Sequence, residues 1–470
     1  MASERASPGL MTILADRRLA LMLGLGFSSG LPFLLVFGTL SAWLRESQVA
    51  LSAIGLFSYL ALAYSFKFLW SPLVDAFDVP LLSRLLGRRR AWMVACQILI
   101  AAGLLGISVS DPASAIWVTV AFAFIVAFGS ATQDVVIDGW RIDAAPSSRQ
   151  GMMAAAYQLG YRLALISAGA GALYIADFVS WQAAYVTMAC LVGVGMVSAL
   201  LAPIVDRGAD GVPAATPGHP KQKFHFGRAV VEPLADLFAR HGTVLVAILA
   251  LVALYRLPDF VAGVMANPLY IDLGFTKTEI ANVSKLYGVW VGIIGAFAGG
   301  LVLPKLGLRN TLLIGAIAGA GSNLMFSWLA LVDKPDAAMT LFGQTFDLSF
   351  LAMPDRKLAL LTLAISIDNF SGSFAGTALI AYMSGLTAAG FAATQYALLS
   401  SLYALPGKLV GGISGFMVES FGYPVFFAMT ALVGIPVVLL CLAINPKAPE
   451  SKEPDPEEEP APPAAAMPAR

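Results

Sequence analysis

Twelve long apolar runs constrain this chain more than any other feature of its sequence. The hydrocarbon core of a bilayer is about 30 Å thick, so a crossing helix needs about 20 consecutive apolar residues. The runs lack the strict alternation of polar and apolar residues that marks transmembrane strands. We therefore predict an all-α, polytopic membrane bundle of twelve transmembrane helices. The predicted spans are 19–41, 51–71, 91–110, 115–139, 150–176, 183–203, 243–267, 279–302, 309–332, 358–386, 392–419 and 424–444.

The composition excludes several other classes of protein. Hydrophobic residues make up 58% of the chain and charged residues 12%, whereas soluble domains average about 25% charged residues. Basic and acidic residues number 29 each, so the basic surplus of a nucleic-acid-binding protein is missing. Cys96, Cys190 and Cys441 lie far apart in apolar runs, without the spacing of a metal or redox site. We expect no metal, no cofactor and no nucleic-acid partner.

The distribution of Lys and Arg predicts how the bundle is oriented. If the N-terminus is inside, the inner loops and tails carry nineteen basic residues and the outer loops carry five. Because short cytoplasmic loops are enriched in Lys and Arg, both termini are predicted to be cytoplasmic.

The longest inner connection divides the spans six and six. Its second part has apolar residues at helical spacing, which favours an amphipathic helix on the inner leaflet. The outer loop 333–357 is long enough to fold over the outer mouth. The predicted segments are an N-terminal segment (1–18), a first half (19–203), a linker (204–242), a second half (243–445) and a disordered Pro- and Glu-rich tail (446–470).

The two halves carry a weak internal symmetry. A tight, basic loop containing glycine follows the second span of each half, at Gly87–Arg90 in the first and Gly300–Arg309 in the second. Two parallel six-helix repeats are the architecture of the major facilitator transporters.

Six sequence motifs stand out along the chain. They are Gly26-Phe27-x-Ser29-Gly30-Leu31-Pro32, Lys67-Phe68-Leu69-Trp70-Ser71-Pro72-Leu73-x-Asp75, Gly87-Arg88-Arg89-Arg90-x-Trp92, Ser130-Ala131-x-Gln133-Asp134-x-Val136-x-Asp138-x-Trp140, Leu159-Gly160-Tyr161-Arg162 and Ala393-Thr394-Gln395-Tyr396-Ala397-Leu398-Leu399-Ser400. With these motifs the chain resembles one family of these transporters, the AmpG-type muropeptide permeases, over nearly all of residues 19–443. One departure is Ser71, which stands where the general facilitator loop motif begins with glycine.

The resemblance implies a function and a location. It implies proton-driven import of N-acetylglucosaminyl-1,6-anhydro-N-acetylmuramyl disaccharides, with or without the stem peptide, from periplasm to cytoplasm for peptidoglycan recycling. The protein would lie in the inner membrane of a Gram-negative bacterium. Its partners would be the glycopeptide substrate, protons and the bilayer, and we expect a monomer.

The fourth span contains the clearest candidates for proton coupling. Asp134 and Asp138 are four residues apart and share one helix face, and Arg141 follows at the inner end. A buried carboxylate near a cation can be tuned to take up and release a proton. The alternative for Asp134 is a permanent ion pair, and for Asp138 we favour bracing with Arg141 or with Arg88–Arg90. All three histidines lie in the linker, which leaves carboxylates to couple protons.

The fifth span offers substrate-binding residues in the first half. Gln158, Tyr161 and Arg162 share one face, with Gln158 near mid-depth. The fork of donors on Arg162 suits a substrate carboxylate. The alternative is a salt bridge from Arg162 to Asp134. Gly30 and Gln133, from the family motifs, complete the first-half candidates.

The second half offers a corresponding set of polar residues inside apolar spans, where charged groups normally face the bundle interior. An internal Arg256–Asp259 pair is the main alternative to substrate binding. The candidates are Tyr255, Arg256, Asp259, Lys285, Asp368, Asn369, Gln395 and Tyr396.

An inner gate is the third predicted site. Lys67 is interpreted as an anchor that reaches the inner interface. For the arginines, simple topogenic charge is the alternative to gating. The predicted gate residues are Asp75, Arg88, Arg89, Arg90, Asp138 and Arg141.

Three other functions are alternatives to muropeptide import. A carrier for another bulky anion, such as an acyl-coenzyme or a nucleotide-sugar, would use the same kind of site. A membrane-embedded sugar transferase would need a catalytic loop domain, and no loop supplies one, so we predict that the chain is not an enzyme. A channel fits buried, mixed charges in two symmetric halves less well, and no GxxxxGK[ST] phosphate-binding loop is present.

Overall fold

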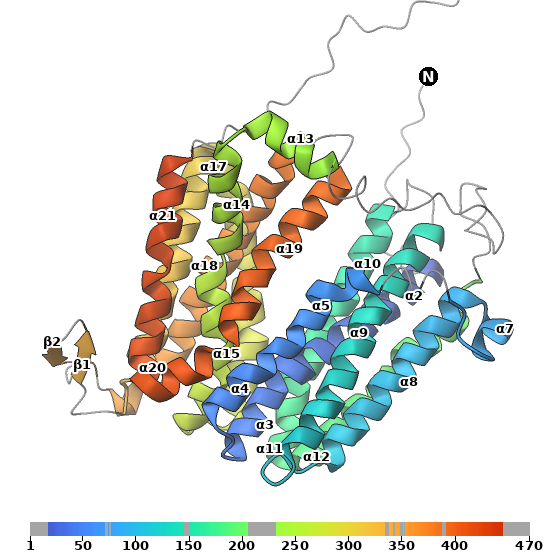
Figure 1. Cartoon of the computed structure of the whole chain (residues 1–470). Helices are drawn as coiled ribbons and strands as arrows, with labels where there is room; N and C mark the ends of the chain where they lie inside the picture. Colours follow the sequence, from blue (N-terminus) through green and yellow to red (C-terminus); the bar gives the residue numbers. More distant parts are fainter. Residues whose placement is uncertain are drawn as a thin grey trace, which may run out of the picture.

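The computed structural model describes residues 17–70, 74, 77–144, 150–204, 232–333, 338–341, 344–347, 351, 353–387 and 392–444. Asp75, most of the N-terminal segment, the first part of the linker and the tail lie outside these residues. Figure 1 shows two helical lobes that adjoin at one end of the bundle and diverge toward the other.

The first lobe contains six membrane passes in chain order. The first pass consists of α2 (Arg17–Leu34), η1 (Leu35–Thr39) and α3 (Leu40–Glu46), and the second of α4 (Leu51–Phe57), η2 (Ser58–Ala61), α5 (Leu62–Phe66) and η3 (Lys67–Leu69). The third is α8 (Arg88–Val109) and the fourth is α9 (Ile116–Ala144). The fifth consists of α10 (Gln150–Ile166), η5 (Ser167–Gly171) and α11 (Ala172–Phe178), and the sixth is α12 (Trp181–Leu201). A short helix, α7 (Leu82–Leu86), precedes the third pass.

The second lobe follows α13 (Glu232–His241), which is the helix predicted in the linker. The seventh pass is formed by α14 (Val244–Leu254) and α15 (Leu257–Asp272). The eighth and ninth are formed by α16 (Lys277–Ile280), η7 (Ala281–Tyr287) and α17 (Gly288–Leu329), and the tenth by η9 (Pro354–Arg356) and α18 (Lys357–Leu386). The last two are formed by α19 (Ala392–Gly411), α20 (Ser414–Leu432) and α21 (Gly434–Ala443).

The number of passes agrees with the prediction of twelve. Within the described part of the chain, nine helices are long and apolar enough to cross a membrane. One of them, Lys277–Leu329, is broken at Gly307 and supplies two passes. The shorter apolar helix Leu51–Phe66 and the helix α19 supply the remaining two.

Glycines make the tight turns between passes, and two of them repeat by symmetry. Gly87 has φ 75° and ψ 160°, and Gly307 has φ 75° and ψ 164°. A residue with a Cβ is strained at such positive φ values, so glycine is the default there. Both turns follow the second pass of their lobe, as the internal symmetry of the sequence predicts.

The two ends of the bundle differ, and we name them by their landmarks. The α13 end carries α13 and the start of α2, whereas the hairpin end carries the α11–α12 turn and a β-hairpin (Figure 1). The hairpin pairs β1 (Ala338–Leu341) with β2 (Gln344–Asp347) antiparallel. The hairpin lies beside α20 at the edge of the second lobe, so the described part of loop 333–357 is not folded over the mouth.

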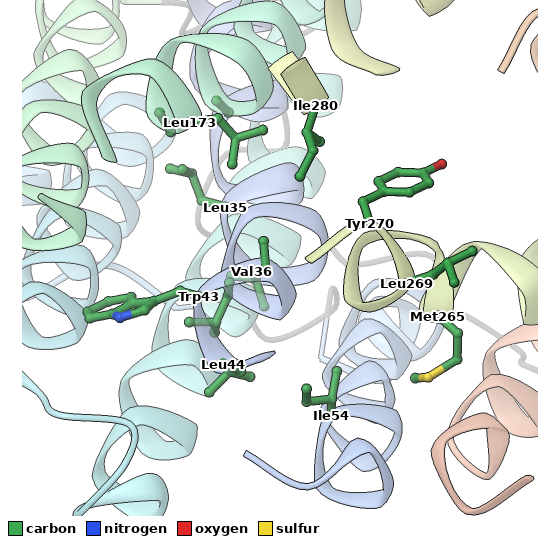
Figure 2. Packing of buried hydrophobic residues seen from close by; sticks show 14 of the residues in the cluster. Leu35, Val36, Trp43, Leu44, Ile54, Leu173, Met265, Leu269, Tyr270 and Ile280 are labelled. Carbon is green, nitrogen blue, oxygen red and sulfur yellow. The ribbon is translucent and has the colours of Figure 1, made fainter. Parts of the chain in front are cut away.

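A continuous apolar core joins the lobes at the hairpin end. Buried residues of the first lobe, including Leu35 and Ile54, belong to the same cluster as Met265 and Leu269 of the second. Figure 2 shows these side chains converging from both lobes. Well-packed apolar contact of this kind fixes the lobes against each other at this end.

Three helices widen into π-helical turns where the lobes meet. These turns are η1, η5 and η7, and η5 contacts both of the others. The Thr39 hydroxyl of η1 donates to the carbonyl of Ala168 in η5 at 2.7 Å. Single π-helical turns occur frequently at functional sites, which directs attention to this level of the bundle.

Candidate functional site

A central cavity of about 350 Å³ lies between the two lobes. The first lobe lines it with side chains from its first two passes, several of them aromatic, such as Phe33 and Phe37. The second lobe adds polar groups, notably Asp259, Asn267 and Lys285. A mostly apolar pocket with a few convergent polar groups is typical of a small-molecule site.

A second cavity, of about 290 Å³, extends the first into the second lobe. The two cavities share Asp259, Gly263 and Lys285 in their walls. The second also contains Arg256, Asp368 and Asn369. Five predicted substrate-binding residues of the second half therefore line two adjoining cavities.

A break in the seventh pass positions Arg256. The helix α14 ends at Leu254, and α15 begins at Leu257 with Pro258 in its first turn. Proline has no N–H to donate and clashes with the carbonyl four residues earlier, so a helix cannot run through this point undisturbed. The break leaves Arg256 at the start of α15 with its side chain turned toward α18.

Arg256 is anchored on two sides. Its Nε lies 2.9 Å from Asp259 Oδ2, and its Nη1 donates to the carbonyl of Gly372. A Cβ added at Gly376 would lie 3.3 Å from the guanidinium, so a small residue makes room for it. The internal Arg256–Asp259 pair considered from the sequence is confirmed.

Asp368 and Asn369 face the same space from α18. The hydroxyl of Ser322 donates to Asp368 Oδ1 at 3.2 Å. Asn369 donates to the carbonyl of Ile365 at 3.1 Å, which leaves its amide oxygen available to the cavity. Two carboxylates and an arginine thus gather in one lobe.

Lys285 connects this cluster to the first lobe. It lies in the π-helical turn η7, and its Nζ donates to Asn267 Oδ1 at 3.1 Å. Asn267 in turn donates to the carbonyl of Gly38 in η1 at 3.0 Å. The chain of contacts from Lys285 to Gly38 crosses the junction of the lobes at the cavity wall.

The first lobe holds its own charged group, Asp134. Its side chain is 15% exposed, and the nearest cation is Lys67, with Nζ 4.0 Å from Asp134 Oδ2. The side chains of Tyr64, Tyr157 and Tyr161 lie in the surroundings of this carboxylate. The structure pairs Asp134 with Lys67 and not with Arg162, the alternative considered from the sequence.

Several buried polar atoms around Asp134 are poorly satisfied. Among the described residues, Asp134 Oδ1 and the hydroxyls of Ser29, Tyr64 and Ser130 have no hydrogen bond of ordinary geometry. Leaving a buried polar group unpaired costs about 1–3 kcal/mol. This region is therefore suited to accept a proton, water or a substrate group.

Other predicted residues of the first half have different surroundings. Gln158 and Arg162 are exposed on α10, and Tyr161 is half-buried. Gln133 is fully buried and donates to Ser28 at 3.1 Å. A Cβ added at Gly30 would lie 2.6 Å from the Tyr161 carbonyl, so Gly30 lets α2 and α10 pack closely.

The structure separates three second-half candidates from the cavities. The Tyr255 hydroxyl donates to the Leu312 carbonyl at 2.8 Å inside the helix packing. Gln395 lies under α13, where it donates to Asp236 at 2.7 Å and accepts from Arg240 at 3.2 Å. Tyr396 packs beside it against the apolar cluster of the second lobe.

The predicted gate residues make contacts within the first lobe. Arg141 lies 3.6 Å from Asp138, which confirms the bracing favoured for Asp138. Arg89 packs against Gly139 of α9, and Arg90 donates to the carbonyl of Leu200 in α12. Arg88 also lies at the start of α8 and has a partner.

Among the described residues, the ion pairs between the lobes lie at the hairpin end. Arg45 Nε is 2.5 Å from Asp272 Oδ1, and Lys277 Nζ is 2.8 Å from Glu46 Oε1. Tyr423 donates to Asp272 at 2.8 Å. The sequence analysis did not predict these pairs, because their only signal in the sequence is opposite charge at the outer ends of spans.

Lys67 and Lys408 are two further cations that the sequence interpretation did not place at the site. Lys67 faces Asp134 within the bundle, so its interpretation as an anchor at the inner interface is wrong. Lys408 donates to the hydroxyl of Ser65 at 2.7 Å and lines the central cavity.

Two six-helix lobes around a cavity, with apolar side chains on the first-lobe wall and charged groups on the second-lobe wall, define a membrane carrier. Comparison with known proteins agrees with this class. Residues 20–407 match the sequence profile of the Major Facilitator Superfamily. The chain is 35% identical to the anhydromuropeptide permease of Escherichia coli K12, over 92% of this chain and 80% of that protein. It is 34% identical to a Rickettsia felis protein named "Putative transporter AmpG 4", over 93% of this chain and 98% of that protein.

Solved structures share the fold at low sequence identity. The nucleoside transporter NupG gives a TM-score of 0.62 at 14% identity, over 91% of this chain and 99% of that one. A D-xylose-proton symporter gives 0.61 at 13% identity, over 94% of this chain and 99% of that one. The chain belongs to the major facilitator superfamily and, within it, to the AmpG-type permeases.

Proposed function

We propose that the chain is a proton-driven importer of anhydro-muropeptides, the disaccharide N-acetylglucosaminyl-1,6-anhydro-N-acetylmuramic acid with or without its stem peptide. The observation that carries the proposal is the cavity between the lobes together with the adjoining cavity in the second lobe, with Arg256, Asp259, Lys285 and Asp368 in their walls. It occurs in a chain whose relative, at 35% identity, is an anhydromuropeptide permease.

The proposed orientation places the α13 end in the cytoplasm of a bacterial inner membrane. The bias of nineteen inner to five outer basic residues supports this orientation. The interlobe ion pairs at the hairpin end then close the periplasmic side. The described conformation corresponds to an inward-facing step of the transport cycle, in which the substrate is released to the cytoplasm.

Recognition of the substrate would combine charge with aromatic surface. Muropeptides carry carboxylates, and Arg256 and Lys285 place cations beside the cavity. Phe33, Phe37 and Tyr64 form a ring cluster with centroids 5.2–6.0 Å apart, whose first two members line the central cavity. Flat aromatic faces provide large apolar contact area for sugar rings at low entropic cost.

Proton coupling is assigned to Asp134. Its carboxylate has one cation at 4.0 Å and one oxygen without a hydrogen bond of ordinary geometry. Protonation would remove the negative charge that faces Lys67, and we propose that this step is linked to closure of the lobes around substrate. Asp138 is a weaker choice, because it is paired with Arg141 and its side chain is 53% exposed.

The proposal is tested by uptake of labelled anhydro-muropeptide into vesicles that contain the purified chain. Accumulation should require an inward proton gradient and should be competed by the disaccharide and the disaccharide-peptide, but not by the free peptide. The Lys285→Met variant should bind substrate more weakly, and Lys305→Met, outside both cavities, serves as the matched control. Uptake that an uncoupler leaves unchanged would contradict proton coupling.

A carrier for another bulky anion is the second candidate. The cations Arg256, Lys285 and Lys408 around the cavities would serve any large anionic substrate. An acyl-coenzyme or a nucleotide-sugar that competes as well as the muropeptide would favour this alternative.

A further inference from the structure

A third cavity, of about 460 Å³, lies at the α13 end of the first lobe, away from the transport site. It is formed where α2 and α8 begin and α12 ends. Its walls contain Arg17, Arg18 and Arg90 together with residues 200–203. None of these residues belongs to the two cavities between and within the lobes.

Two of the arginines touch the end of α12 without using most of their donors. Arg17 Nη2 donates to the carbonyl of Leu201 at 3.0 Å, and Arg90 Nη2 donates to the carbonyl of Leu200. These carbonyls lie in the last turn of the helix, where intrahelical partners run out. A guanidinium has five N–H donors, and Arg90 Nε is buried without a hydrogen-bond partner in the described part of the chain.

The second lobe shows that capping alone needs only one arginine. Arg309 begins the ninth pass, and its Nη2 donates to the carbonyl of Leu442 at the end of α21, at 2.8 Å. This contact is the symmetry counterpart of the one between Arg90 and Leu200. The first pass of the second lobe starts at Val244 and has no arginine equivalent to Arg17 in residues 242–246. The first lobe therefore has more cations at the end of α12 than capping of that helix requires.

The rim of this cavity is apolar and faces outward. Leu200, Leu201 and Ile204 are 41%, 51% and 49% exposed. All three lie at the end of a membrane-spanning helix, where exposed apolar side chains meet acyl chains and arginines meet headgroups. A site for a soluble phosphate would have no use for such a rim.

We propose that this cavity binds the phosphate group of an anionic phospholipid in the leaflet at the α13 end. The planar fork of Arg17, which is exposed at the start of α2, matches the phosphate oxygens, and Arg90 adds positive charge to the same cavity wall. Basic pockets between transmembrane helices are a recurrent mode of headgroup binding. The lipid holds the starts of α2 and α8 to the end of α12, which ties together three helices of the first lobe.

The test measures lipid retained by the purified full-length chain, using native mass spectrometry. The probes are phosphatidylglycerol, phosphatidylcholine with the same acyl chains, and inorganic phosphate as competitor. Phosphatidylglycerol should be retained in preference to phosphatidylcholine and should not be displaced by phosphate. The variants Arg17→Gln and Arg90→Gln should each weaken its binding about fivefold.

Arg309→Gln is the matched control, because it removes a helix-end contact of the same geometry from the second lobe. It should leave phosphatidylglycerol binding unchanged. If Arg90→Gln does not fold, Arg17→Gln alone decides the test, since Arg17 lies exposed at the start of α2. Equal binding of the two lipids, displacement by phosphate, or an equal loss in Arg309→Gln would each overturn the proposal.

Discussion

Two buried carboxylates, Asp259 of the second lobe and Asp134 of the first, are held in different ways. Asp259 in the second lobe is 2.9 Å from Arg256, which is itself fixed to the Gly372 carbonyl. Asp134 in the first lobe has its nearest cation at 4.0 Å and an oxygen without a hydrogen bond of ordinary geometry among the described residues. A tightly paired carboxylate stays charged and positions its partner, whereas an under-paired one can change its protonation at little cost. This contrast supports the proposal that Asp259 anchors Arg256 and that Asp134 couples transport to protons.

The largest expected effect is on transport by Asp134→Asn. Without an ionisable group at this position, proton and substrate movements are no longer linked, and the accumulation ratio should fall to about one. Thermal unfolding of the purified variant should be nearly unchanged, because few native contacts are lost. Uptake into vesicles under a proton gradient measures the effect, and Asp138→Asn is the control. Full accumulation in Asp134→Asn would move coupling to another carboxylate.

The reverse pattern is expected when the tight pair is broken. Arg256→Gln leaves Asp259 buried without its cation, which should destabilise the protein by about 3 kcal/mol. The double variant Arg256→Gln/Asp259→Asn should recover most of this loss, because no unpaired charge remains. The measurement is thermal unfolding in detergent. Equal stability of the single and double variants would show that the pair is not the source of the effect.

A smaller effect is expected from the ion pairs between the lobes. Asp272→Asn removes the partner of Arg45 and of Tyr423. Partly exposed pairs contribute about 1 kcal/mol at most, so opening at the hairpin end should become about fivefold more frequent. The readout is the labelling rate of a Ser41→Cys variant, with Cys190 replaced, by an impermeant maleimide added at the hairpin end.

Asp111→Asn is the control for this experiment. Asp111 is also at the hairpin end, but it bonds only within its own turn, to Ala113 and Ser114. Labelling of the Ser41→Cys variant should not change when Asp111 is replaced. A labelling rate that Asp272→Asn leaves unchanged would mean that the apolar core alone holds this end closed.

The smallest expected effect concerns a carboxylate outside the membrane. Hydrogen bonds from Gln395 and Arg240 hold the pKa of Asp236 below its ordinary value of 3.8. Because the folded pKa is depressed, the contribution of Asp236 to docking of α13 is present above pH 3.8 and is lost as the pH falls through the folded pKa. Hydrogen exchange of the α13 amides, corrected for intrinsic rates, should show this loss, and Asp236→Asn should abolish its pH dependence.

The architecture could be predicted from the sequence because it rests on local information. The length of an apolar run determines a pass, and the glycine-containing loops at Gly87 and Gly307 predicted the repeat of the two lobes. The Arg256–Asp259 pair could also be considered in advance, since residues three apart share a helix face.

The sequence could not predict which neighbour a single side chain faces, or which residues far apart in the sequence form pairs. Lys67 and Gln395 lie at predictable depths, yet neighbouring helices decide that one faces Asp134 and the other faces α13. Arg45 and Asp272 are 227 residues apart, and no periodicity connects them. Such contacts depend on how the lobes pack, which a single sequence does not encode in any local pattern.

The π-helical turns at the junction of the lobes have a geometric consequence for Lys285. A π turn contains one residue more than an α turn, and one residue corresponds to a rotation of about 100° around the helix axis. Shortening η7 by a single residue would therefore swing Lys285 relative to the helix that follows it, and its bond to Asn267 would be lost. The number of residues in the π-helical turn therefore sets the direction of the Lys285 side chain as much as its own rotamer does.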